Sequence, residues 1–253
     1  MSPWIVALVS FACVMCAALA GMRLRRALPE HHLNEASKDT VRLVSGLIAT
    51  LSALVLGLLI ASSKNSFDAV NDGLKHSAAK VIQIDRLLAQ YGPEADAARA
   101  GLRAAYAERL RSLFPQGGGE ANAANPIAGA AAGEQMEQRI HSLVPGTDMQ
   151  RSLQRQALAL SNDIALARWV AMEEIGNRTP PALLAILVLW LAAMFGSFGL
   201  FAPNNVTALV ALLIGAMSVA TSILLIEEMG DPLGGLISVS SAPMVKALAL
   251  LGT

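Results

Sequence analysis

Hydrophobic residues in this chain are gathered into long runs that no charged side chain interrupts. Such runs extend from Met1 to Met22, from Leu43 to Ser63 and from Thr179 to Ile226. A helix needs about 20 apolar residues to cross roughly 30 Å of hydrocarbon. The first two runs therefore predict one spanning helix each, and the third, which contains Pro203, predicts two. The pattern predicts an all-α polytopic membrane protein with four transmembrane helices.

The predicted spans divide the chain into parts with different environments. These parts are residues 1–63 with transmembrane helices at about 3–22 and 41–63, a helical extramembrane domain at 64–178, a transmembrane hairpin at 179–226 and a C-terminal tail at 227–253. Within them, we expect Asp39 or Thr40 to cap the second span, and Glu227 with Glu228 to end the fourth. The tail is expected to finish in a short interfacial helix.

One stretch of the extramembrane domain lacks the pattern of a packed helix. Residues 115–133 are rich in Gly, Ala and Asn and are predicted to form a flexible loop. A short helix is expected to follow at about 134–144 and to end at Pro145-Gly146.

The first apolar run has a second interpretation, a cleaved signal peptide. Ala18-Leu19-Ala20 before Gly21 resembles a cleavage site. A signal peptide carries basic residues before its apolar core, whereas here Arg23, Arg25 and Arg26 come after it. This order favours a retained helix.

Composition agrees with a membrane protein and disfavours a nucleic-acid partner. Hydrophobic residues make up 54% of the chain and charged residues 15%, against about 25% charged in soluble domains. The formal net charge is zero and the sequence has no basic stripe. Cys13 and Cys16 fall inside the first apolar run, where we interpret them as packing residues.

A heptad pattern continues directly from the second span and predicts a seam between helices. From Phe67 to Tyr91 apolar positions alternate three and four apart, as in coiled coils. We interpret this seam as the contact between subunits of an oligomer, formed by Val70, Leu74, Val81, Ile84 and Leu88. Asp85-Arg86 lies beside it, either as a charge pair that locks subunits together or as a solvated flank.

Extending the same seam backward into the membrane predicts a pore-lining face. A helix drifts about 20° per heptad against the repeat, which brings further positions onto this face. The candidate residues are Gly46, Ala49, Thr50, Ala53, Leu56, Gly57, Ile60, Ser63 and Phe67. Leu56 and Ile60 would then form apolar rings that can stop ions by dewetting. Ordinary helix packing is the alternative.

Other candidate sites are weaker. Phe195, Phe198 and Phe201 recur every three residues and could constrict a pore or simply pack in the membrane. Metal ligation by His31, His32 and Glu35 is a minor candidate beside solvated polarity near the membrane. Asn204 and Asn205 are expected to serve the turn of the hairpin.

No catalytic motif is present, and neither an enzyme nor a cofactor is expected. The sequence contains no Gly-rich phosphate loop, no G-x-S-x-G elbow and no H-E-x-x-H pair.

Six segments carry a resemblance to a known family. They read LPEHHLNEASKD, GLIATLSALVLGLLIASSKNSFD and IDRLLAQYGPEADAAR, and later ARW, FGSFGLFAPNN and EEMGDPLGGLISVSSAP. Together they resemble the bacterial bestrophin-like membrane family, which is remotely similar to the bestrophin anion channels. That resemblance implies a pentameric channel whose second membrane helix lines the pore. The acidic run of the bestrophin calcium clasp has no counterpart here, so calcium gating is not implied.

Two functions remain open from the sequence. One is a homo-oligomeric channel for small ions in a bacterial inner membrane, with the lipid bilayer and other copies of the chain as partners. The alternative is a non-conducting membrane scaffold whose helical domain binds partner proteins. By the positive-inside rule, the basic residues of the connector at 23–40 predict that this connector lies in the cytoplasm and the large domain outside. The resemblance to bestrophins instead implies that the large domain lies inside.

Overall fold

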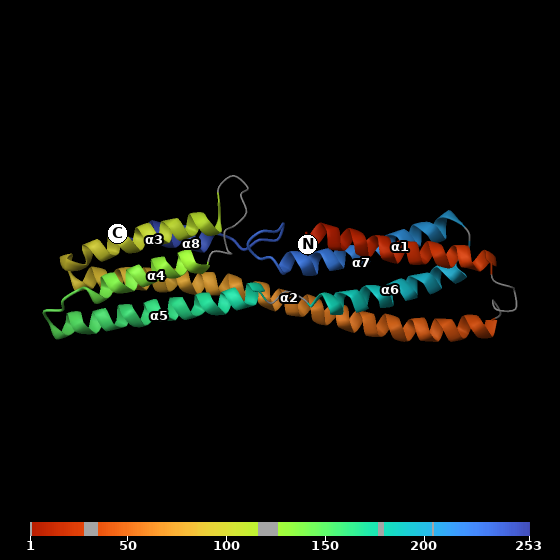
Figure 1. Ribbon diagram of the computed structural model, residues 1–253, viewed down its shortest axis with the longest axis horizontal. Helices are drawn as coiled ribbons and strands as arrows, with labels where there is room; N and C mark the ends of the chain where they lie inside the picture. Colours follow the sequence, from red (N-terminus) through yellow and green to blue (C-terminus); the bar gives the residue numbers. More distant parts are fainter. Residues whose placement is uncertain (1, 28–34, 116–125, 177–179, 204) are drawn as a thin grey trace. The chain divides into compact units, whose positions relative to one another are not determined.

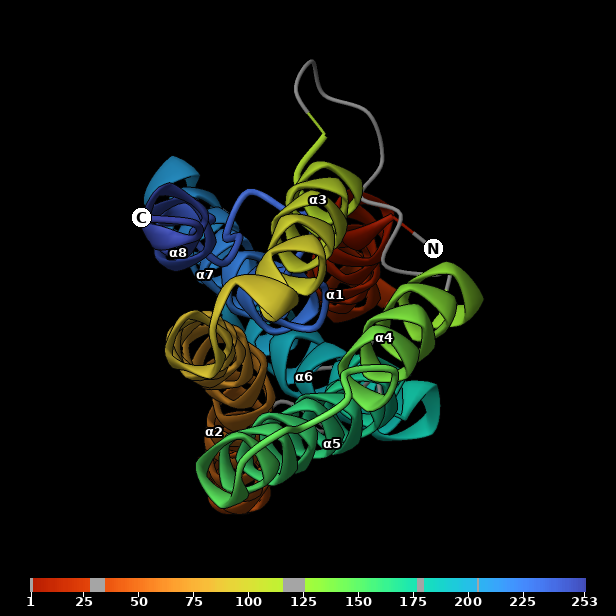
Figure 2. The same cartoon turned by 90° about the vertical axis from the view of Figure 1, so that its left-hand side faces the viewer.

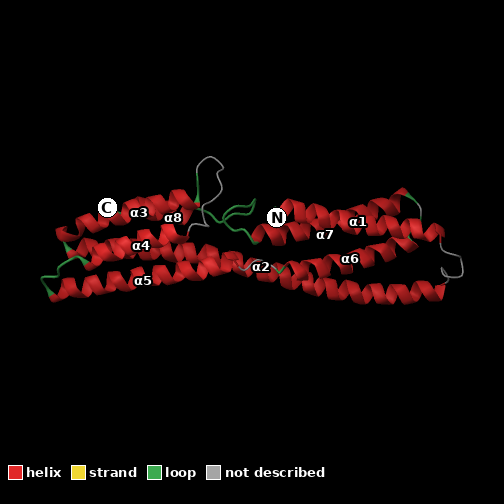
Figure 3. Ribbon diagram, viewed as in Figure 1, coloured by secondary structure: helices red, strands yellow, loops and turns green. Residues whose placement is uncertain are grey.

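The computed structural model describes residues 2–27, 35–115, 126–176, 180–203 and 205–253; most of these are helical and none forms a strand (Figures 1 and 3). The helices are α1 (Pro3–Ala27), α2 (Glu35–Tyr91), α3 (Asp96–Leu113), α4 (Pro126–His141), α5 (Asp148–Gly176), α6 (Pro181–Phe201), α7 (Val206–Met229) and α8 (Ala242–Leu250), with a 3₁₀ turn η2 (Pro93–Ala95). Four of them, α1, α2, α6 and α7, are long and apolar enough to span a membrane. The prediction of an all-α protein with four transmembrane helices is confirmed.

The chain forms two compact units. The membrane unit comprises Met1–Asn65 and Arg178–Gly230, and the helical unit comprises Ser66–Asn177 and Asp231–Thr253. α2 contributes to both, since it runs as one helix of 57 residues. Its first turn begins at Glu35, so Asp39 and Thr40 lie inside the helix and the prediction that they cap it is wrong. Asp39 instead pairs with Arg42 one turn later, at 3.4 Å.

Glycines bring α1 and α6 into backbone contact in the membrane unit. A Cβ atom added to Gly21 would lie 2.1 Å from the carbonyl oxygen of Gly196, and one added to Gly199 would lie 2.0 Å from that of Ala18. Because lipid gives apolar helices no hydrophobic drive to associate, such close van der Waals packing stabilises the pair. Around this contact a core forms from Val14, Ala18, Leu59, Leu187, Leu191, Phe195, Leu212, Ala216 and Ile226.

Polar groups cap the end of α6 and the start of α7, at the turn of the hairpin that these helices form. Arg25 of α1 donates a hydrogen bond to the carbonyl oxygen of Ala202, which ends α6. A cation at this end also complements the helix dipole. Asn205 caps α7, because its Oδ1 accepts a hydrogen bond from the Ala208 amide at 2.8 Å. Asn204 lies outside the described residues.

The helix of the fourth span runs slightly beyond the two glutamates. α7 continues through Glu227 and Glu228 to Met229, and Glu228 is buried at 4% exposure. A carboxylate can remain in a helix and be buried when it has a polar partner, and Glu228 has one. α7 ends one residue after Glu228, and the prediction that the two glutamates end the membrane span itself stays a prediction.

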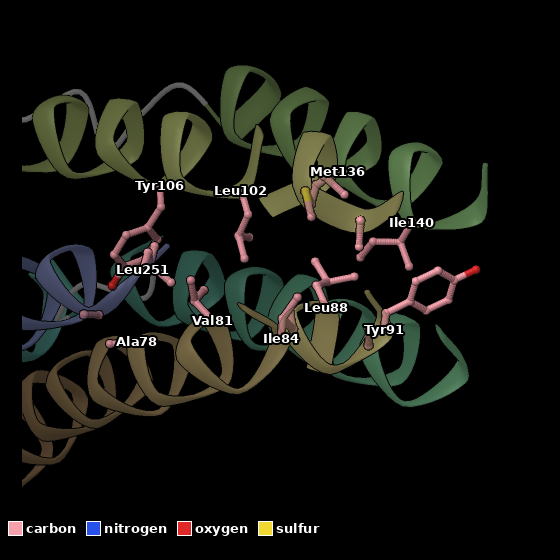
Figure 4. Packing of buried hydrophobic residues seen from close by; sticks show 14 of the residues in the cluster. Ala78, Val81, Ile84, Leu88, Tyr91, Leu102, Tyr106, Met136, Ile140 and Leu251 are labelled. Atoms are coloured by element: carbon pink, nitrogen blue, oxygen red, sulfur yellow. The ribbon is translucent and has the colours of Figure 1, made fainter. Parts of the chain in front are cut away.

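Five helices surround the core of the helical unit: α8, α3, α4, α5 and the second half of α2 (Figure 2). The side chains that fill this core come from each of them. Figure 4 labels members from α2, α3 and α4 together with Leu251. Its members include Val81, Ile84, Leu88, Tyr91, Leu102, Tyr106, Met136, Ile140, Leu153, Ala157, Met244, Ala247 and Leu251. Burial raises the pKa of the Tyr106 hydroxyl to about 12.

Two predictions about the helical unit need correction. α4 begins at Pro126, so the C-terminal part of the loop predicted at 115–133 is helical. Alanine has the highest helix propensity, and proline suits the first helical position, which explains a helix where composition suggested a loop. The C-terminal helix α8 is not interfacial, since Met244, Ala247 and Leu251 are buried in the core of the helical unit.

Candidate functional site

The membrane-spanning half of α2 is covered by the membrane unit along one narrow face. The buried positions on it are Ser45, Ser52, Leu59 and Ser63, with exposures of 4%, 3%, 8% and 6%. Their spacing of seven and four residues places them on a single side of a helix. Ser52 Oγ is buried and has no hydrogen-bond partner among the described residues. This half of α2 therefore lies against the unit by one side only.

The uncovered surface of α2 has two chemically different faces. One carries large aliphatic side chains, Leu47, Leu51, Leu54 and Leu58, with exposures of 63%, 42%, 61% and 62%. The other carries Gly46, Thr50, Ala53 and Gly57, all exposed. Beyond the nearby backbone of α2 itself, no described atom lies within 4 Å of a Cβ built at Gly46 or Gly57. The first face suits lipid tails, and the second suits a closely approaching helix or water.

The predicted pore-lining residues fall partly on this small-residue face. Gly46, Thr50, Ala53 and Gly57 lie on it, whereas Ala49, Leu56, Ile60 and Phe67 are half-buried and Ser63 is buried. Leu56 and Ile60 pack against the core of the membrane unit. They lie at the border between the covered and uncovered sides, since each retains partial exposure.

The seam predicted between subunits belongs to the interior of the chain. Val81, Ile84 and Leu88 have exposures of 5%, 1% and 1% and pack in the core of the helical unit, and Leu74 packs against that core. Val70 is also buried, at 4%. Apolar residues spaced three and four apart indicate that one face of a helix is buried. They do not indicate which part of the same chain, or which other chain, buries it. The interpretation as an intersubunit contact is therefore wrong for these three core residues.

Asp85 follows neither of the two predicted interpretations, whereas Arg86 is exposed, as the solvated flank predicts. Asp85 is 1% exposed and pairs with Arg99 of α3, whose Nε and Nη2 lie 3.0 and 3.2 Å from its carboxylate oxygens. Hydrogen bonding to this carboxylate raises the pKa of Arg99. Asp85 Oδ2 also accepts a hydrogen bond from the Gly252 amide at 3.3 Å, and Arg86 Nη1 donates to the Thr253 carbonyl oxygen at 2.8 Å. Both residues therefore tie α2 to other parts of the same chain.

The remaining candidates fall in three different places. Phe195 is 6% exposed in the core of the membrane unit, next to Phe198, which is 46% exposed. Phe201 is half-buried. Glu35 forms an exposed ion pair with Lys38 at 2.7 Å, and hydrogen bonding to Lys38 lowers the pKa of Glu35. His31 and His32 lie outside the described residues, and within the part of the chain that the structure describes no cluster of metal-ligating side chains occurs.

Two half-buried arginines stand out in the charge distribution of the helical unit. Burial lowers the pKa of both Arg109 on α3 and Arg168 on α5, and Arg168 lowers that of Arg109 further. The Glu134 carboxylate of α4 favours the charged form of Arg168. The sequence did not point to these residues, because they come close together only in the folded unit.

These features define an integral membrane protein with a helical unit outside the membrane-spanning segments. The bestrophin-like domain model matches residues 12–244, and the chain belongs to the bestrophin-like family. No curated protein matches the chain.

The fold is similar to solved bacterial membrane proteins. One mutant of a bestrophin homologue from Klebsiella pneumoniae aligns with a TM-score of 0.69 at 14% identity, over 99% of this chain and 98% of that one. A second mutant of that homologue aligns with a TM-score of 0.67 at 14% identity, over 98% and 96%. A structure described as a membrane protein aligns with a TM-score of 0.66 at 14% identity, over 99% and 98%. At this identity the likeness shows the fold.

Proposed function

We propose that five copies of this chain assemble into a channel that passes small ions along an axis lined by α2. Membership of the bestrophin-like family supports a channel. The observation that carries the proposal is the uncovered small-residue face of α2, formed by Gly46, Thr50, Ala53 and Gly57. Small residues let helices of neighbouring copies approach one another, and they leave room for water where the helices diverge.

This face carries few polar groups that could bind an ion, so contacts with ions would be weak and reversible. The Thr50 hydroxyl donates to the Gly46 carbonyl oxygen at 3.0 Å and keeps its lone pairs available as acceptors. No charged side chain occurs between Leu43 and Ser63. Conduction requires binding weak enough for release, so such a lining favours passage over retention.

The direct test is a planar-bilayer recording of the purified protein, with its oligomer mass measured in the same detergent. A pentameric mass together with unitary currents supports the channel. A pentamer that is silent under all ionic conditions favours the scaffold alternative, in which the helical unit binds partner proteins.

Leu56 and Ile60 provide a sharper test of the proposed axis. They flank the small-residue face and would be the largest apolar side chains beside it. A ring of such side chains can hold back ions by dewetting. Leu56→Ser or Ile60→Thr is expected to raise resting conductance about tenfold, equal to a barrier lowered by about 1.4 kcal/mol. Single-channel recording at zero stimulus measures this.

Matched controls for the gate lie on the aliphatic face of the same helix turns. Leu54→Ser and Leu58→Thr remove similar apolar volume at positions that are 61% and 62% exposed. They are expected to leave conductance unchanged. Equal effects at all four positions, or none at any, would remove the gate from α2.

The proposed location is a bacterial inner membrane, with the helical unit on the side facing away from the cytoplasm. Basic residues concentrate at Arg23, Arg25, Arg26 and Lys38, near the ends of the connector between α1 and α2, and the positive-inside rule places such a connector in the cytoplasm. A single cysteine at exposed His141, in a Cys13→Ala, Cys16→Ala background, should react with a membrane-impermeant maleimide in intact cells. Reaction only after the cells are permeabilised would reverse the orientation.

A further inference from the structure

Arg109 of α3 lies where the helix pattern places a core residue. Leu102, Tyr106 and Leu113 are buried on the inward face of α3, with exposures of 6%, 8% and 3%. Arg109 comes three residues after Tyr106 and four before Leu113, so its side chain leaves the helix on that same face. It is half-buried, whereas the side chain of Arg111 on the same helix is 69% exposed. A cation therefore stands in line with the apolar residues of α3.

Arg168 has the corresponding position on α5. The inward face of this helix is formed by Leu153, Ala157, Leu160 and Ile164, which pack in or against the core of the helical unit. Arg168 follows Ile164 by four residues, one turn farther along that face, and is also half-buried. The inward faces of α3 and α5 thus each include one arginine.

The guanidinium of Arg168 lies against the backbone of α4. A Cβ atom added to Gly133 would lie 2.8 Å from Arg168 Nη2 and 3.4 Å from Nη1. Gly133 is three residues before Met136, which is 6% exposed in the core, so this contact is on the inward face of α4. α4 packs on both α3 and α5, and it therefore joins the two helices that carry the arginines.

The charges of this cluster do not balance among the described residues. Burial lowers the pKa of Arg168, and the Glu134 carboxylate opposes that effect. Burial also lowers the pKa of Arg109, and the like charge of Arg168 lowers it further. Arg168 has a polar contact of its own, whereas Arg109 forms no ion pair or hydrogen bond with a described residue. Two guanidinium groups and one carboxylate leave a positive charge that is partly desolvated and has no counter-ion, which is unfavourable by itself.

We infer that Arg109 and Arg168 bind an oxyanion of the phosphate class between α3, α4 and α5. A guanidinium presents its donors in a planar fork that matches the oxygen atoms of phosphate, and two such groups on different helices can contact one tetrahedral anion from two sides. The anion supplies the missing negative charge and links α3 to α5. The site lies within the helical unit and does not depend on the proposed channel.

The first test is the effect of inorganic phosphate on the thermal stability of the full-length protein in detergent. Sodium chloride at equal ionic strength is the reference. A ligand that binds only the folded protein stabilises it by mass action, so phosphate at about ten times its Kd should raise the Tm by roughly 3–6 °C. Arg109→Gln is expected to raise the Kd for phosphate at least tenfold. Arg111→Gln makes the same change at an exposed position of α3 and should leave the Kd unchanged.

Stability without phosphate distinguishes a binding site from an ordinary structural contact. Arg109→Gln removes the uncompensated charge, so its Tm in sodium chloride should equal or exceed that of the wild type. A Tm that falls in sodium chloride while phosphate stabilises the variant as much as the wild type would overturn the site.

Glu134→Gln is expected to have the opposite effect on phosphate. Glu134 is exposed, so the substitution leaves the core intact, and it removes the carboxylate that acts on Arg168. With two uncompensated guanidinium groups, the Kd for phosphate should fall at least threefold. An unchanged or higher Kd in Glu134→Gln would overturn the proposed charge balance and the site with it.

Nanodiscs of phosphatidylcholine separate the two sources of a phosphate group. Stabilisation by free phosphate in these discs assigns a soluble oxyanion to the site. Stabilisation by phosphatidic acid added to the discs, without a response to free phosphate, assigns a lipid headgroup. In either case Arg109→Gln should abolish the response. A wild-type protein that responds to neither form of phosphate would overturn the inference, whether or not the protein conducts.

Discussion

Replacing Gly199 by alanine is expected to prevent α1 and α6 from packing as they do in the native membrane unit. The added Cβ would lie 2.0 Å from the carbonyl oxygen of Ala18, and a backbone oxygen can move away only if its helix moves. Separating the helices loses the close contacts along their length, which we expect to cost about 3 kcal/mol or more. Thermal unfolding of the purified protein in detergent should show a Tm lower by roughly 10 °C.

Gly73→Ala is the matched control for this prediction. It adds the same methyl group inside α2 where no atom beyond the helix's own nearby backbone lies within 4 Å, and alanine favours a helix by about 1 kcal/mol over glycine. Its Tm should equal or exceed that of the wild type. Equal losses of stability at both positions would mean that glycine content, and not the α1–α6 contact, determines the effect.

Asp85→Asn is expected to destabilise the helical unit by about 3 kcal/mol. The change keeps the shape of the side chain but removes the charge that Arg99 and the Gly252 amide face in the interior. Removing one member of a buried ion pair leaves the other charge desolvated, which costs about 3–5 kcal/mol. The 18% exposure of the Arg99 side chain places the loss toward the lower end. Hydrogen exchange of α2 and α3 amides in the intact protein measures it.

Asp163→Asn makes the same chemical change in an exposed pair of the same unit. Asp163 and its partner Lys80 have side-chain exposures of 57% and 31%. Exposed pairs contribute about 0–1 kcal/mol, so exchange should change little. If Asp163→Asn accelerated exchange as much as Asp85→Asn, burial would not be the source of the effect at Asp85.

The transmembrane helices could be predicted from sequence because their signal is local. An unbroken apolar run such as Leu43–Ser63 has few alternatives to a membrane span, and Pro181 and Asn205 mark helix starts by their own backbone preferences. Continuation of α2 beyond the membrane was also predictable, since neither proline nor a turn motif interrupts it before Gly92-Pro93.

The partners of each helix face could not be predicted in this way. Val81, Ile84 and Leu88 have the same spacing whether their contacts lie within the chain or between chains. Asp85 is flanked by the seam residue Ile84, yet its burial depends on Arg99 and Gly252, and the spacing of residues in α2 carries no information about either. Periodicity shows that a surface is covered, whereas three-dimensional contacts are needed to show by what.

The small-residue signal also proved ambiguous. Glycines in the second span suggested close helix packing, yet Gly46 and Gly57 are uncovered in the single chain. The close backbone contact instead uses Gly21, Gly196 and Gly199, which occur in α1 and α6. In the FGSFG segment the sequence suggested a role for the aromatic residues, whereas its two glycines form the contact.

The order of synthesis has a consequence for how the helical unit matures. Its core combines residues translated between the second and third spans with Met244, Ala247 and Leu251, which are translated only after the fourth. Until these last residues leave the ribosome, the apolar sides of α2 and α3 have no α8 to cover them. The nascent chain must therefore insert all four spans before the core of the helical unit is complete. Chaperone protection is needed most during that interval, because exposed apolar helix faces associate readily.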